Sequence, residues 1–155
     1  MPIDNSNMLK VIEDFPQQCK TALELPKGIS VSGKIDKIFI CGMGGSAVGG
    51  DLLKIYMHNS KIPVFVVRDY KVPSFVDENS LVFAVSYSGN TEETISAYED
   101  ALKKKAKIVA VTSGGQLGIM AKKVVKIPSG LQPRAALGYL FFPVLGVLNN
   151  SGIVD

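Results

Sequence analysis

Short, uniformly apolar runs that alternate with helix-length segments limit the possible folds of this sequence more than any other feature. Strands that are apolar on both sides belong to a parallel sheet whose two faces are covered by helices. The connection between two parallel strands needs a helix-length crossover, and the spacing provides one. The runs are 37–41, 64–67, 81–85, 108–112 and 124–127. The sequence therefore predicts an α/β fold, a three-layer α/β/α sandwich with a five-stranded parallel sheet.

Helices are expected around these runs. The first covers residues 7–25 and contains Pro16, which kinks or breaks a helix because proline has no backbone N–H. Its candidates for burial are Leu9, Val11, Ile12, Phe15 and Leu23. Further helices are expected up to about residue 59, at 91–105, at 117–123 and at 134–149. The last is apolar nearly all round and needs a partner, so we expect a homodimer or packing against a second domain.

Bulk properties exclude several classes of protein. A chain of 155 residues suits one ordinary domain, and a net charge of +3 is too small to indicate nucleic acid. Cys19 and Cys41 have neither metal nor redox spacing, so we interpret both as free buried thiols in a reducing compartment. The longest apolar stretch, 135–148, is shorter than the roughly 20 residues that span a bilayer. We expect a cytoplasmic protein with no metal, no cofactor, and neither nucleic acid nor membrane as a partner.

A hydroxyl-rich turn, Ser86-Tyr-Ser-Gly-Asn-Thr91, follows the third strand and opens a helix. Free N–H groups and the helix dipole make such a helix start favourable for an anion. Ser86, Ser88 and Thr91 can each donate an O–H to phosphate oxygens. The turn has no lysine, and it therefore suits a sugar phosphate better than a nucleoside triphosphate.

A purely structural interpretation of this turn is also open. Asn90 is followed three residues later by Glu93, which is typical of a capping box. Serine, threonine and asparagine are ordinary residues at helix starts. The turn alone does not decide between a cap and a ligand loop.

A second loop, Gly42-Met-Gly-Gly-Ser-Ala-Val-Gly-Gly50, directly follows the first strand. Gly42, Gly44 and Ala47 fit a dinucleotide fingerprint, and Asp69 after the second strand could bind a ribose hydroxyl. The loop could instead form one wall of a sugar-phosphate pocket, with the serine turn as the other wall. In a flavodoxin-like strand order the first and third strands are neighbours, which would bring both loops to one ligand site. This pairing favours the monophosphate over the dinucleotide.

Three motifs together resemble a known family. Cys41-Gly-Met-Gly-Gly-Ser46, Ser86-Tyr-Ser-Gly-Asn-Thr91 and Pro133-Arg-Ala-Ala-Leu137 occur in this order. They are similar to the first half of the bifunctional phosphoglucose/phosphomannose isomerases, a branch of the sugar isomerase (SIS) domain superfamily. The resemblance covers nearly the whole chain, and it implies an N-terminal helical segment at 1–30 followed by a flavodoxin-like SIS domain at 31–155.

The resemblance also implies roles for individual residues. It implies that Ser86, Ser88 and Thr91 bind the substrate phosphate, that Gly45 and Ser46 line the sugar site, and that Arg134 lies near the reacting carbons. Family enzymes carry their base glutamate and ring-opening histidine in a second SIS domain, which is absent from this sequence. We interpret the single histidine, His58, as a surface residue, and we expect Glu92 and Glu93 to offset the helix dipole rather than act as bases.

Three functions follow as hypotheses. The first is an isomerase of phosphorylated hexoses that acts through a cis-enediolate on glucose 6-phosphate, fructose 6-phosphate and mannose 6-phosphate, with this chain as its phosphate-binding half. The second is a non-catalytic SIS module that senses a sugar phosphate. The third is a dinucleotide-binding domain.

Overall fold

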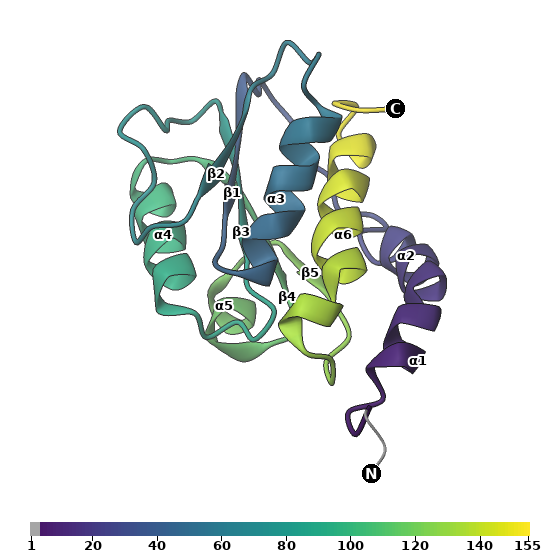
Figure 1. Ribbon diagram of the computed structural model, residues 1–155. Coiled ribbons are helices and arrows are strands. Elements are labelled where there is room, and N and C mark those ends of the chain that lie inside the picture. The colour runs from purple at the N-terminus through teal and green to yellow at the C-terminus, as the bar shows by residue number, and fades with distance from the viewer. Residues whose placement is uncertain (1–3) are drawn as a thin grey trace.

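The computed structural model describes residues 4–155 and confirms the three-layer arrangement (Figure 1). Five parallel strands form one sheet in the order β2-β1-β3-β4-β5, which is the predicted flavodoxin-like order. The strands are β1 (Lys37–Cys41), β2 (Val64–Val67), β3 (Ser80–Val85), β4 (Lys107–Thr112) and β5 (Val124–Lys126). Every predicted apolar run is a strand, because side chains on both sides of the strands are covered.

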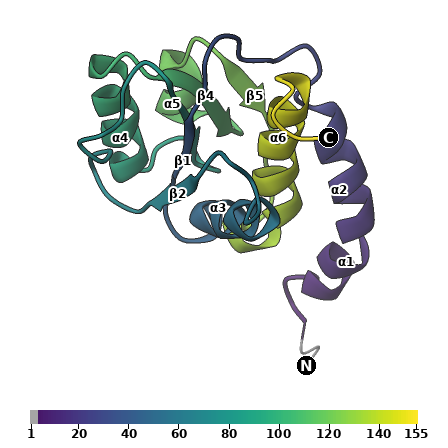
Figure 2. The same cartoon turned by 90° about the horizontal axis from the view of Figure 1, so that it is seen from above.

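Helices cover both faces of this sheet (Figure 2). They are α1 (Met8–Glu13), α2 (Phe15–Glu24), α3 (Gly45–Tyr56), α4 (Glu92–Lys103), α5 (Gly115–Met120) and α6 (Leu137–Asn150), with a 3-10 helix η1 at Pro133–Ala135. α3 and α6 pack on one face, α4 and α5 on the other, and α2 lies outside against α6. Ile38 and Ile40 of β1 point to the α3–α6 side, whereas Phe39 and Cys41 point to the α4 side.

The N-terminal helices break at Pro16 as predicted, but the expected buried residues are wrong. α1 ends at Glu13, and Pro16 lies in the first turn of α2, where its missing N–H costs nothing. Leu9, Ile12, Phe15 and Leu23 are exposed, and Val11 is half-buried. The helix instead buries Gln18 and Ala22. The small and polar side of α2 therefore faces the domain, and its apolar side faces outward.

The last helix finds its partners within the chain. α6 buries one side against the sheet and packs against both α2 and α3. Gly146 lets Pro26 approach so closely that a Cβ at this glycine would lie 2.4 Å from the proline Cγ. The apolar character of α6 is thus explained by contacts inside the domain.

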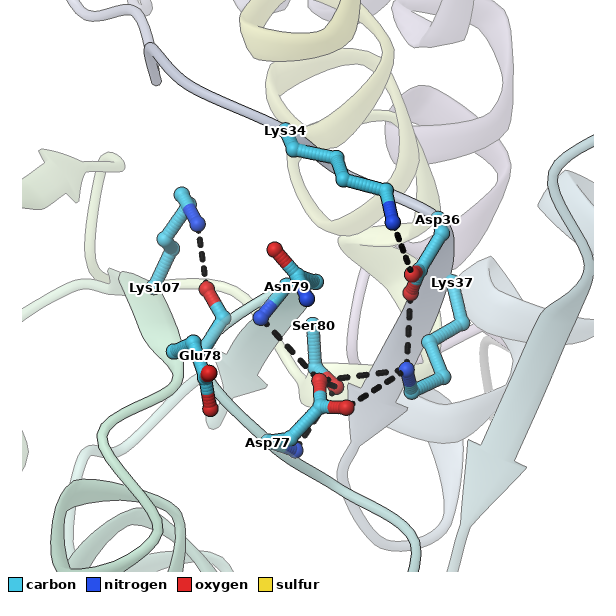
Figure 3. Close-up of polar contacts among 8 residues, drawn as sticks. All are labelled: Lys34, Asp36, Lys37, Asp77, Glu78, Asn79, Ser80 and Lys107. Atoms are coloured by element: carbon cyan, nitrogen blue, oxygen red, sulfur yellow. Dashed lines mark hydrogen bonds and ion pairs between the residues drawn. The ribbon is translucent and has the colours of Figure 1, made fainter.

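The amino ends of the strands carry a network of charged and polar groups (Figure 3). The Lys37 ammonium, at the start of β1, donates to Asp36 over 2.7 Å and to Asp77 over 3.1 Å. Asp77 also accepts hydrogen bonds from the Ser80 hydroxyl over 2.9 Å and from the Asn79 N–H over 3.0 Å. Lys107, at the start of β4, donates to the Glu78 carbonyl. These contacts join β1, β3 and β4 at the edge opposite the two predicted ligand loops.

Candidate functional site

The two predicted loops meet at the carboxyl ends of β1 and β3, which are neighbours in the sheet. The Tyr87 N–H donates to the Ser46 hydroxyl over 3.4 Å, which connects the serine loop (86–91) to the start of α3. Gly42 lies so close to β3 that a Cβ there would be 2.8 Å from the Val85 carbonyl oxygen. The structure therefore confirms that the loops lie side by side at the switch point of the sheet, where ligands of open α/β folds bind.

The serine loop is organised by its own hydroxyl groups. The hydroxyls of Ser86 and Thr91 lie 2.9 Å apart, and the Ser86 oxygen also accepts from the Gly89 N–H over 3.0 Å. The Ser88 oxygen accepts from the Asn90 N–H over 3.2 Å, and Ser88 itself is exposed. Ser86 is buried and Thr91 is half-buried. The structure thus brings Ser86 and Thr91 together and leaves Ser88 on the surface of the loop.

The start of α4 is not closed by a capping box. The N-cap residue is Thr91, whose side chain makes no hydrogen bond to the helix and pairs with Ser86 instead. The Asn90 side chain accepts from the Gln116 N–H over 2.9 Å. The capping-box interpretation is therefore wrong, because both candidate caps have other partners. The N–H groups of the first turn remain oriented toward the loop side of the helix, as an anion site requires.

Other groups at the start of α4 either favour or oppose the binding of an anion. Thr94 carries a buried hydroxyl that has no hydrogen-bond partner among residues 4–155, and such groups are normally met by water or a ligand. Glu92 and Glu93 place two carboxylates in the first turn. The Glu93 charge lies close enough to Tyr70 to raise the pKa of its phenol. Because these carboxylates repel an anion, binding would depend on directed O–H and N–H donors.

Arg134 lies in the short helical turn η1, Pro133–Ala135, here called the Arg134 turn. This turn lies directly on the glycine loop, residues 42–50. A Cβ at Gly45 would be 3.2 Å from the Pro133 carbonyl oxygen and 3.4 Å from the Arg134 Cα. Arg134 is exposed, and among the described residues no carboxylate lies within ion-pair distance of its guanidinium. Gly45 and Ser46, predicted from one motif, are therefore neighbours of Arg134, predicted from another, and Ser46 is linked to the serine loop. Within residues 4–155, the Arg134 charge is not neutralised by a carboxylate.

A third loop contributes to the site, and it was not predicted from the sequence. Thr112-Ser-Gly-Gly115 follows β4, which pairs with β3 on the side away from β1. A Cβ at Gly89 would lie 1.9 Å from the Gly114 carbonyl oxygen, and one at Gly115 would lie 2.4 Å from the Ser88 oxygen of the main chain. The Ser113 hydroxyl donates to the Tyr87 carbonyl over 2.7 Å. The cluster of small residues at a third carboxyl strand end was the available signal.

The remaining candidates do not join this site. Asp69 is exposed and accepts from the Tyr70 N–H over 2.6 Å, and His58 is exposed beside the Ile55 carbonyl, as expected of a surface residue. Burial raises the pKa of the Cys41 thiol to about 12, which makes it unreactive near neutral pH. Residues 4–155 contain no group of three or more His, Cys, Asp or Glu side chains that could hold a metal ion. In the same part of the chain, no helix is both long and apolar enough to cross a membrane.

Cavities coincide with these loops only in part, and one of about 210 Å³ is lined by Thr112, Gly114 and Gly115 of the third loop. A cavity of about 350 Å³ lies near the amino ends of β4 and β5, where Val31, Tyr98, Lys107 and Lys123 are among its lining residues. It shares no residue with the serine loop or with the Arg134 turn. Concavity therefore touches the predicted site at its third loop.

The fold defines an α/β domain in which two loops face each other at the switch point of the sheet. Residues 33–136 match the family model of the SIS domain, so the chain belongs to the SIS domain family. A bifunctional phosphoglucose/phosphomannose isomerase of Caldicellulosiruptor bescii is 51% identical over 96% of the chain and 46% of that protein. One of Thermoplasma acidophilum is 48% identical over 85% of the chain and 43% of that protein. The chain spans less than half the length of these relatives.

Solved structures share the fold. A phosphoheptose isomerase of Francisella tularensis superposes with a TM-score of 0.67 at 17% identity, over 97% of the chain and 100% of that protein. At this identity the similarity shows the fold alone. It agrees with the predicted three-layer SIS architecture.

Proposed function

We propose that this chain is the phosphate-binding half of a sugar-phosphate isomerase that interconverts glucose 6-phosphate and fructose 6-phosphate and also accepts mannose 6-phosphate. The observation that carries the proposal is the uncapped start of α4, whose first-turn N–H groups follow directly after the loop that carries Ser86, Ser88 and Thr91. Such an arrangement suits the phosphate of a small ligand. The bifunctional isomerases among the relatives supply the substrate class.

Arg134 is the proposed electrostatic residue of the reaction. Isomerisation of an aldose to a ketose removes a proton from the carbon beside the carbonyl and passes through a cis-enediolate. A guanidinium beside the developing negative charge lowers the barrier if it is oriented before the reaction. The position of Arg134 over Gly45, beside Ser46, and its lack of an ion-pair partner among residues 4–155 support this role.

The base and the ring-opening group are proposed to come from a second SIS domain. The only histidine, His58, is exposed at the far end of α3, and Glu93 lies next to Tyr70. We therefore assign neither the proton transfer nor the ring opening to this chain. The division into a helical segment at 1–30 and an SIS domain at 31–155, and the cytoplasmic location, stay predictions.

A second SIS domain or a second copy of the chain is the proposed partner. Exposed apolar side chains follow one stripe of α3, at Val48, Leu52 and Ile55, and the last of these is 69% exposed. Leu9 and Ile12 of α1 are exposed as well. A partner that covers such a stripe would remove apolar surface from water, which favours association.

A thermal-shift titration tests the binding part of the proposal. Fructose 6-phosphate, glucose 6-phosphate, inorganic phosphate and NAD are added separately to the chain. A ligand that binds only the folded state raises stability by RT ln(1 + [L]/Kd), or about 2.7 kcal/mol at a hundredfold excess over Kd. We expect a rise with both sugar phosphates and none with NAD. A rise with NAD alone would support the dinucleotide alternative and overturn the proposal.

Turnover tests the catalytic part, in a longer protein that contains both SIS domains. Arg134→Ala should lower kcat more than it weakens phosphate binding, because the guanidinium is assigned to the transition state. Unchanged kcat would remove this role from Arg134. Sugar-phosphate binding without isomerase activity in the longer protein would favour the sensing module instead.

A further inference from the structure

A buried glutamine of the N-terminal helix holds the segment that carries Arg134. Gln18 of α2 is 7% exposed, and its side-chain amide bonds at both ends. Its Nε2 donates to the Ala135 carbonyl over 3.0 Å, and its Oε1 accepts from the Gly138 N–H over 2.7 Å. These backbone groups lie 117 and 120 residues away in sequence and flank the junction between η1 and α6.

This contact does what a local cap would otherwise do. The N-cap residue of α6 is Ala136, whose side chain cannot accept a hydrogen bond. The first N–H groups of a helix need partners from outside it, and Gln18 provides one for Gly138. Gly138 leaves room for this approach, because a Cβ there would lie 2.7 Å from the Gln18 Oε1.

Packing alone does not explain a glutamine at this position. A buried amide costs free energy unless its donor and acceptor are both paired, whereas an apolar side chain would fill the same space without that requirement. The amide therefore orients the backbone, because its two hydrogen bonds fix the Ala135 carbonyl and the Gly138 N–H relative to α2. Arg134 precedes Ala135, so its backbone position depends on this contact.

Gln18 is one of several contacts that hold the Arg134 turn, and downstream it acts together with Ala136, which is buried in the core. Upstream, the Leu131 N–H donates to the Tyr87 hydroxyl over 2.9 Å. Underneath, Gly45 supports Pro133 and the Arg134 Cα. α2 lies outside residues 33–136, which match the SIS family model, so the third support comes from an element that the family model does not include.

We propose that Gln18 is a positioning residue that holds Arg134 over the glycine loop and makes helix α2 part of the ligand site. The effect on ligand binding rests on the proposed function, whereas the effect on the Arg134 turn does not. Two experiments measure these two effects of Gln18 separately.

The first readout is trypsin cleavage of the Arg134–Ala135 bond, compared with cleavage after Lys126, which is also exposed. Gln18→Met keeps the length of the side chain and removes both hydrogen bonds. We expect cleavage after Arg134 to become about threefold to tenfold faster, while cleavage after Lys126 stays unchanged, because a lost hydrogen bond shifts a local opening equilibrium by about that factor. Gln17→Met is the matched control, since exposed Gln17 donates only to Thr21. Equal rates after Arg134 in Gln18→Met and the unmodified chain would overturn the proposal, as would equal acceleration at both sites.

The second readout is the affinity for fructose 6-phosphate in a double-mutant cycle. Gln18→Met should weaken binding about fivefold in the unmodified chain and should have no effect in the Arg134→Ala background. A loss of the same size in both backgrounds would show that Gln18 acts independently of Arg134 and would overturn the proposal. If the unmodified chain binds no fructose 6-phosphate, the proposed function fails for this chain, and the trypsin comparison still decides the role of Gln18.

Discussion

The Tyr87 hydroxyl accepts a hydrogen bond from the Leu131 N–H over 2.9 Å and donates to the Pro128 carbonyl over 3.0 Å. Tyr87 belongs to the serine loop, whereas Pro128 and Leu131 belong to the segment that leads to the Arg134 turn. One side chain thus joins two motifs that lie more than 40 residues apart. Its ring is 7% exposed, so neither hydrogen bond is easily replaced by water.

Removing this hydroxyl should destabilise the domain. Tyr87→Phe keeps the ring and leaves the Leu131 N–H and the Pro128 carbonyl without their partner. We expect the free energy of unfolding to fall by about 1–3 kcal/mol, measured by urea denaturation. Tyr56→Phe is the control, because Tyr56 is 53% exposed and should change stability very little. Equal stabilities of both variants would show that the Tyr87 hydroxyl does not hold the two segments.

A second prediction concerns the contact between the serine loop and the loop after β4. Gly89 and Gly28 both have positive φ, +72° and +78°, but only Gly89 lies against another chain segment. Alanine at either site is strained by about 1–2 kcal/mol in the left-handed region. Gly89→Ala should lose about 1–3 kcal/mol more, because its Cβ meets the Gly114 carbonyl oxygen. Thermal unfolding of the two variants measures the difference, and equal losses would contradict the close contact.

Stability at low pH should depend on the network at the amino ends of β1 and β3. Hydrogen bonds from Lys37 lower the pKa of Asp36 and of Asp77. A carboxyl whose folded pKa is depressed stabilises the fold above its unfolded pKa, about 3.9, and loses this contribution as pH falls through the folded pKa. The free energy of unfolding should therefore decrease as the pH falls below about 5.

Lys37→Met tests the source of this pH dependence. Without the ammonium, the two carboxyl groups should titrate nearer their ordinary pKa, so the loss of stability below pH 5 should be shallower than in the unmodified chain. Urea unfolding between pH 3 and pH 7 measures both slopes. Lys34→Met is the comparison: Lys34, 3.5 Å from Asp36, lowers the pKa of Asp36 less than Lys37 does and does not act on Asp77, so the slope should change less. Parallel profiles in Lys37→Met and the unmodified chain would show that Lys37 does not set these pKa values.

Much of the sheet could be predicted from the sequence, whereas the packing of α2 could not. Strands such as β3 are buried on both faces, so their apolar runs have no competing explanation. In α2, hydropathy favours burial of Phe15 and Leu23 and exposure of Gln18, and the structure has the reverse. The reversal depends on the Ala135 carbonyl and the Gly138 N–H, which lie far along the chain. No local pattern contains those two partners.

The candidate site, too, could be predicted from the sequence only in part. The glycine loop and the serine loop could be placed together because the strand order brings β1 and β3 side by side. The Thr112–Gly115 loop has no charged residue and no complete motif, so its contact with Gly89 became visible only in the structure. Small residues at a strand end indicate a close approach, but they do not say what approaches.

Ser86 and Ser88 should respond differently to loss of their hydroxyl groups. The Ser86 hydroxyl is buried and bonds both Thr91 and the Gly89 N–H, whereas Ser88 is exposed and bonds only the Asn90 N–H. Ser86→Ala should therefore lower the free energy of unfolding by about 1–2 kcal/mol and weaken fructose 6-phosphate binding as well. Ser88→Ala should leave stability within about 0.5 kcal/mol. Its affinity should still fall about tenfold or more, because a hydrogen bond to a charged phosphate is lost. Thermal shifts with and without fructose 6-phosphate separate the two effects. If Ser88→Ala binds as tightly as the unmodified chain, the exposed hydroxyl is not a phosphate ligand, and the anion would have to be held by the N–H groups at the start of α4.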